Sequence, residues 1–69
     1  MENEWVVLAR FADEMTSQVA VDRLMVNDIE AVTIDKRESV YNVDGYIELC
    51  VHRDNAIIAL EMIKDLVSE

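Results

Sequence analysis

The sequence is poor in the residues that staple or interrupt small folds. It has no proline, one glycine, one cysteine and one histidine among 69 residues. A single cysteine excludes an internal disulfide, and a single histidine beside it leaves no cysteine–histidine cluster for a structural metal. Hydrophobic residues make up 52% of the chain. A domain this small therefore depends on apolar burial, alone or with oligomerisation, for its stability.

Basic residues are also scarce, with 6 against 15 acidic residues and a net charge of −9. The electrostatic field of this negative net charge repels phosphate backbones and anionic lipid heads, so we expect no nucleic-acid or membrane partner. No apolar run approaches the roughly 18 residues of a membrane span. Residues 1–15 carry acids where a signal peptide has basic residues. Together with the lone thiol, these features predict a cytoplasmic protein.

Hydrophobic patterning predicts strands over 4–11, 30–36 and 46–52 and helices over 12–27 and 54–69. The first strand is apolar at both odd and even positions, which is typical of a strand covered on both faces. Strict alternation places Trp5, Val7, Ala9 and Phe11 on one of its faces and Val6 and Leu8 on the other.

The other two strands alternate, which predicts that their apolar residues face the core. These residues are Val32 and Ile34 in the second strand, and Ile47, Leu49 and Val51 in the third. Asp44-Gly45 is a turn signal between the two strands.

The ends of the helices carry capping residues. Asp13 and Asp54 are expected N-caps, and Asn27 is expected to end the first helix in the left-handed conformation. Ala20, Val21, Leu24 and Met25 form the wider apolar stripe of the first helix, and the second helix has a core stripe of Ala56, Ala59, Leu60, Ile63, Leu66 and Val67.

The element order predicts one α+β domain over residues 1–69, a ferredoxin-like β-α-β-β-α half-sandwich. A right-handed crossover makes strands 1 and 2 parallel, and the hairpin inserts strand 3 between them, antiparallel to both. The expected sheet therefore has the order 2-3-1, with both helices on one face. Strand 1 is then an unprotected apolar edge, which favours pairing with another chain.

Three segments resemble a family of short bacterial domains of unknown function that are labelled as signal transducing proteins. "LMVNDIEA" (24–31), "IDKRESVY" (34–41) and "GYIELCVHRDNAIIALEMI" (45–63) follow the family's order and spacing. Asp28 and Glu30 depart from the family's usual glycine and proline. The resemblance implies a ferredoxin-like fold akin to the nitrogen-regulatory PII proteins, and it carries over no catalytic residues.

We expect no catalytic, cofactor-binding or metal site. The expected interaction residues are Trp5, Val7, Tyr41, Val43 and Tyr46, and Lys36 with Arg37 is a candidate anion contact. The apolar residues Val40, Tyr41 and Val43 of the hairpin loop are compatible with core closure, with a partner contact or with a ligand lid. Cys50 and His52 share a strand face, where a free thiol is favoured over a nucleophile pair.

These expectations favour a non-enzymatic regulatory or signalling module that acts by protein–protein interaction and forms a homodimer through strand 1. A further, unidentified protein partner is also compatible with the surplus apolar surface. The alternative is a small-molecule sensor of the PII or ACT type, with a nucleotide or amino acid bound at a subunit interface.

Overall fold

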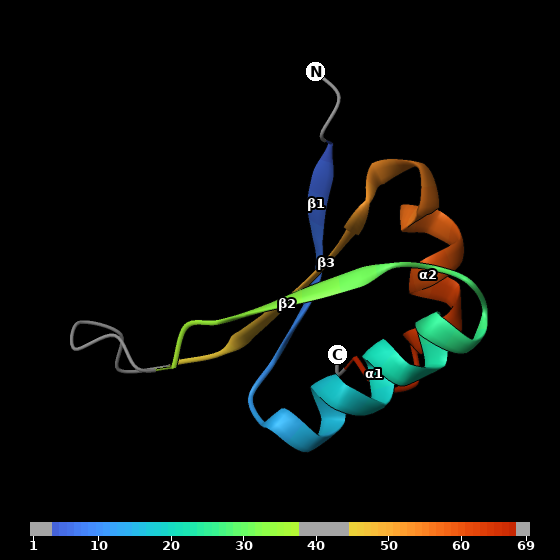
Figure 1. Cartoon of the computed structure of the whole chain (residues 1–69). Helices are drawn as coiled ribbons and strands as arrows, with labels where there is room; N and C mark the ends of the chain where they lie inside the picture. The colour runs from blue at the N-terminus through green and yellow to red at the C-terminus, as the bar shows by residue number, and fades with distance from the viewer. Residues whose placement is uncertain (1–3, 38–44, 68–69) are drawn as a thin grey trace.

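A computed structural model describes residues 4–37 and 45–67 (Figure 1). The elements are β1 (Trp5–Phe11), α1 (Glu14–Val26), β2 (Ala31–Asp35), β3 (Ile47–His52), the 3₁₀ helix η1 (Arg53–Asn55) and α2 (Ala56–Ile63). This arrangement confirms the predicted α+β class. Within these residues, neither α1 nor α2 is long and apolar enough to cross a membrane.

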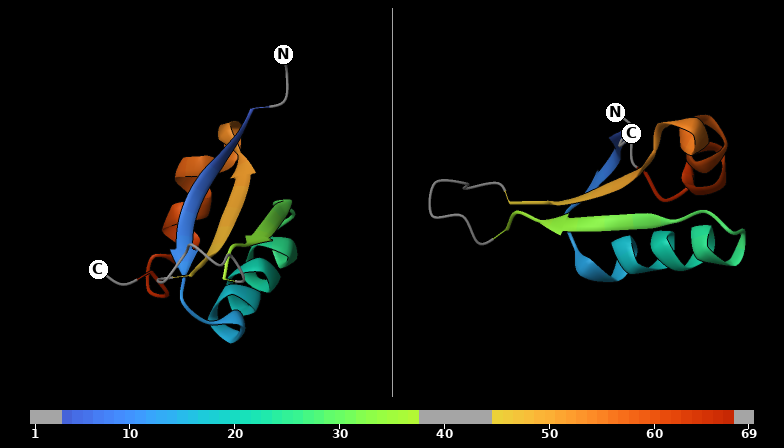
Figure 2. Two further views of the ribbon diagram at one scale, coloured as in Figure 1. Left: turned by 90° about the vertical axis from the view of Figure 1, so that its left-hand side faces the viewer. Right: turned by 45° about the horizontal axis from the view of Figure 1, so that its top comes forward.

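The three strands form one sheet in the order β1-β3-β2, and β3 is antiparallel to both neighbours. This is the predicted order 2-3-1 counted from the other edge. Because β3 runs against both neighbours, β1 and β2 are parallel to each other, with β3 between them. Figures 1 and 2 show both helices on the same side of this sheet.

The core lies between the helices and the sheet. Its buried residues are Ala9, Phe11, Ala20, Leu24, Ile29, Leu49, Val51, Ala59 and Ile63. Leu24, Leu49, Val51 and Ile63 are the largest side chains with no solvent exposure. Their burial confirms that the apolar residues of β3 face the core, as the alternation predicted.

An irregularity in β1 overturns the predicted facing of that strand. Val7 pairs with Cys50, but Ala9 pairs with Leu49, so Leu8 is an extra residue in the ladder. Such a bulge switches the alternation of the residues that follow it. Ala9 and Phe11 therefore face the core, while Trp5 and Val7 lie on the opposite face. The prediction that these four residues share a face is wrong.

The facing of β2 is also opposite to the prediction. Val32 pairs with Cys50 and Ile34 with Glu48, whereas Thr33 pairs with Leu49. Residues directly opposite each other in a ladder share a face, so Thr33 lies on the helix side with Leu49. Val32 and Ile34 therefore lie on the side away from the helices, and each is 44% exposed.

The helix ends confirm one expected cap and correct two others. The Asp13 carboxylate accepts a hydrogen bond from the Thr16 amide at 2.9 Å, as expected of an N-cap. The left-handed residue after α1 is Asp28, with φ of 64°, and not Asn27. Asp54 is not the N-cap of the second helix, because Asp54 lies inside η1 and the N-cap of α2 is Asn55. The His52 imidazole caps η1 by accepting a hydrogen bond from the Asp54 amide.

The predicted helical stripes are partly wrong. Met25 and Leu60, which were expected to pack, are 62% and 44% exposed. α2 also ends at Ile63, so the predicted span of 54–69 is too long.

Candidate functional site: the open face of the sheet

The side of the sheet away from the helices carries the candidate site, which we call the open face (Figure 2). Cross-strand pairs and side-chain contacts assign its members: Trp5, Val7, Arg10, Val32, Ile34, Lys36, Tyr46, Glu48, Cys50 and His52. No further layer covers this face within residues 4–37 and 45–67.

The members form rows across the strands. The first row joins Trp5 to His52, the second contains Val7, Cys50 and Val32, and the third contains Arg10, Glu48 and Ile34. The Trp5 and His52 rings meet edge to face, with centroids 6.2 Å apart. The first two rows are therefore mainly apolar and aromatic, and charge is concentrated in the third row and beyond it.

The apolar members are half exposed at the edges and buried at the centre. Trp5 is 39% exposed and Val7 44%, as are Val32 and Ile34 on the other edge strand, while Cys50 on the central strand is 8% exposed. Single exposed apolar residues are ordinary on a protein surface, whereas a set that lies together on one face makes that face a candidate for contact with another surface.

Glu48 is a buried acid on this face and is held between two cations. Arg10 Nε lies 3.5 Å from Oε2, and Lys36 Nζ lies 3.6 Å from Oε1. The guanidinium of Arg10 also lies over the Tyr46 ring, 5.2 Å from its centroid. A buried charge needs such partners because its desolvation is costly. Arg10, Glu48 and Lys36, which we call the charged trio, therefore form the polar end of a mainly apolar surface.

The surroundings of Cys50 disfavour its thiolate form. Burial raises its pKa, and the nearby Glu48 charge raises it further. A catalytic cysteine needs the opposite shift, because the thiolate is the nucleophile. His52 is the capping acceptor of the Asp54 amide and lies one row away from Cys50. The residues described also contain no group of three side chains suited to a metal ion.

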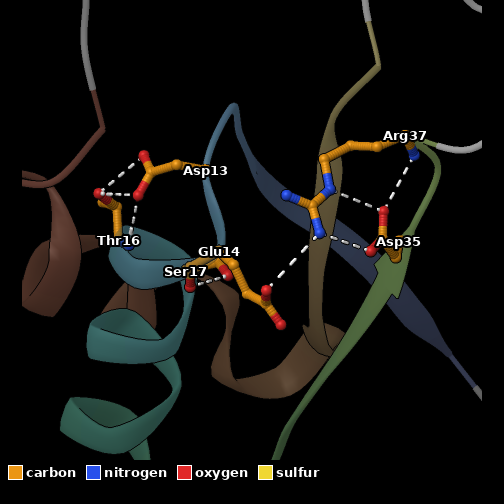
Figure 3. A network of polar contacts seen from close by, with 6 residues as sticks. All are labelled: Asp13, Glu14, Thr16, Ser17, Asp35 and Arg37. Atoms are coloured by element: carbon orange, nitrogen blue, oxygen red, sulfur yellow. Dashed lines mark hydrogen bonds and ion pairs between the residues drawn. The ribbon is translucent and has the colours of Figure 1, made fainter.

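The candidate anion pair is divided between the two sides of the sheet. Lys36 contacts Glu48 on the open face, whereas Arg37 binds Asp35 and approaches Glu14 of α1 at 3.7 Å (Figure 3). Hydrogen bonds from the Arg37 side chain and amide lower the pKa of Asp35 to about 2. Arg37 thus links the end of β2 to the start of α1, and within the part of the chain that the structure describes the two cations contact different carboxylates.

The predicted interaction residues are placed only in part. Trp5, Val7 and Tyr46 lie on the open face, whereas Tyr41 and Val43, like Val40, lie outside the described residues. Sequence reasoning missed Val32 and Ile34 as members because it assigned them to the core. It also missed Glu48 and Arg10, although an acid in the middle of an apolar strand was a signal of a specific partner.

Two surface hollows lie away from the open face, and a third is lined by its member Arg10 together with Phe11, Ala12, Asp13, Thr16, Leu66 and Val67. One is lined by Glu14, Met15, Gln18, Val19 and Asp22, all from α1, and another by Met25 and residues 28–31. A hollow lined by a single helix offers a ligand no enclosure, in contrast to the concave sites of small molecules.

Comparisons of the chain with protein-family models, with curated proteins and with solved structures find no match.

Proposed function

We propose that this chain is a non-enzymatic interaction module that binds a second copy of itself through the open face. The observation that carries the proposal is the apolar set of Trp5, Val7, Val32 and Ile34, which lies on both edge strands around the buried Cys50. A sheet with one face on helices and one face apolar is completed by a second apolar layer.

The local charge supports the same partner. The chain has 15 acidic and 6 basic residues, yet Arg10 and Lys36 lie on the open face with Glu48 as the acid between them. Two copies that meet through this face therefore keep most of their acidic residues apart. A contact through the outer helix surfaces would instead bring acids such as Glu14, Asp22 and Glu61 together.

The expected strength of the contact follows from the exposed fractions. Full burial of a large apolar side chain contributes roughly 1.5 to 3 kcal/mol. The four apolar residues retain 39–44% exposure in each copy. Eight such partial burials contribute roughly 5 to 10 kcal/mol in a dimer, before the costs of association. The dimer is therefore expected to dissociate on dilution.

We further propose that the topology is ferredoxin-like and that the module is regulatory or signalling and cytoplasmic. The β-α-β-β-α order with β3 between β1 and β2 supports the first part. The resemblance of residues 24–63 to signal transducing domains supports the second, and the unpaired Cys50 supports a reducing compartment.

Sedimentation velocity over about 5 to 500 μM tests self-association, because mass action populates a dimer as concentration rises. The expected result is a species of twice the 7.9 kDa chain mass at the upper concentrations. Trp5→Lys and Val7→Lys should shift it to monomer, while Val26→Lys, on a side chain of α1 that is 82% exposed, should not. A wild-type chain that stays monomeric throughout would refute the proposal.

A further inference from the structure

We infer that the second copy binds with its strands antiparallel, around a two-fold axis that crosses the strands at the row of Val7, Cys50 and Val32. This inference rests on the proposed self-association and adds the orientation of the partner and the residues that select it. It derives from the order of side chains along the rows of the open face.

The open-face residues of β3 form a self-complementary series. Glu48 and His52 lie two residues on either side of Cys50 on the same face. Rotation about the inferred axis places each strand over the same strand of the partner, and the two run in opposite directions. Glu48 is then opposite the partner's His52, and the same contact occurs a second time by symmetry.

The two groups match as acceptor and donor. Nδ1 of His52 accepts a hydrogen bond from the Asp54 amide at 3.2 Å, so the neutral ring carries its proton on Nε2. The contacts of the Glu48 carboxylate within the described chain are ion pairs at 3.5 and 3.6 Å, longer than a typical hydrogen bond. The Glu48 carboxylate can therefore accept a hydrogen bond from Nε2–H of the partner's His52.

β1 also places two complementary residues at equal distances from the inferred axis. Trp5 and Arg10 lie in the rows on either side of Val7, because the bulge brings Arg10 opposite Glu48. The same rotation places the guanidinium of Arg10 near the partner's Trp5. A cation near the face of a tryptophan is attracted by its ring, so this contact is favourable as well.

The other face-to-face orientation is disfavoured by charge. A two-fold axis along β3 would place Glu48 opposite the partner's Glu48, and two buried carboxylates repel each other. The inferred axis instead centres the interface on the row of Val7, Cys50 and Val32, and it places each Glu48 opposite the partner's His52 and not opposite a second carboxylate. Packed sheets keep their strands within about 30° of alignment, so rows close to the axis stay within side-chain reach.

A double-mutant cycle in the dimer dissociation constant tests this geometry. Glu48 and His52 are four residues apart on an extended strand, about 13 Å, and have no contact within one chain. The variants are Glu48→Gln, His52→Asn and both together; asparagine keeps an acceptor for the Asp54 amide but loses the distal N–H. Each single change should raise the dissociation constant at least roughly tenfold, because Glu48→Gln makes the acceptor of both symmetric hydrogen bonds neutral and His52→Asn removes their donor.

The double variant should then bind about as weakly as the weaker-binding single variant, because both changes act on the same contact. If the two effects multiply instead, the residues do not meet and the inferred axis is wrong, although the dimer stands. A wild-type monomer at every concentration would refute the proposed function itself. Circular dichroism checks that each variant folds. If a variant fails to fold, a second double-mutant cycle, of Arg10→Gln with Trp5→Leu, tests the same axis and must show the same coupling.

Discussion

Replacement of Ile34 by lysine should weaken the dimer by more than an order of magnitude while leaving the monomer folded. Ile34 is already 44% exposed in one chain, so its loss costs the fold little. Burial of that remaining surface contributes about 1 kcal/mol per copy, on a scale of roughly 1.5 to 3 kcal/mol for a whole side chain. Two copies give about 2 kcal/mol, which is roughly a 30-fold rise in the dissociation constant.

The matched control is Ile57→Lys, which makes the same chemical change on α2, where the side chain is 84% exposed and away from the open face. Both variants change the net charge equally, so general repulsion cannot explain a difference between them. Sedimentation equilibrium gives both dissociation constants, and thermal melting at low concentration checks the fold. Equal dissociation constants for the two variants would show that the open face is not the interface.

Gly45→Ala should destabilise the fold by about 1 to 3 kcal/mol in urea unfolding, because overpacking against fixed atoms is costly. The new Cβ would lie 2.5 Å from Cα of Arg37, and an unchanged midpoint would contradict this close approach. Asp35→Asn should lower the melting temperature at neutral pH. The pKa of Asp35 falls from 3.8 to about 2 on folding, so its stabilisation is complete above pH 4 and is lost as the pH falls towards 2. The difference between wild type and variant should vanish over that range, and a constant difference would count against the Arg37 contact. Cys50 should react with iodoacetamide more slowly than free cysteine at pH 7, because its raised pKa leaves less thiolate; faster reaction would indicate an activated thiol.

The sequence predicted the parts of this fold that depend on local pattern. Alternation in β3 identified Ile47, Leu49 and Val51 as inward-facing, and Asp13 was recognisable as a cap. Period-two alternation separates two faces but does not say which one meets the helices. That choice depends on tertiary register, and in β2 it sends Val32 and Ile34 to the open face.

The bulge at Leu8 explains why the faces of β1 were assigned wrongly and why Arg10 was missed as a member of the site. One extra residue moves Trp5 and Val7 to the opposite face from Ala9 and Phe11, and an evenly apolar strand carries no sign of where such a shift occurs. Arg10 reaches Glu48 only because of this shift. The charged trio is therefore a product of pairing between three strands and could not be read from any one of them.

The most direct test of the account is an isotope-filtered NOE experiment on a mixed sample of labelled and unlabelled chains, which detects only contacts between copies. We expect intermolecular signals from the methyl groups of Val7, Val32 and Ile34 and from the Trp5 ring, at concentrations where the dimer is populated. Intermolecular signals confined to helix residues such as Met15 or Ile57, with none from the open face, would contradict it.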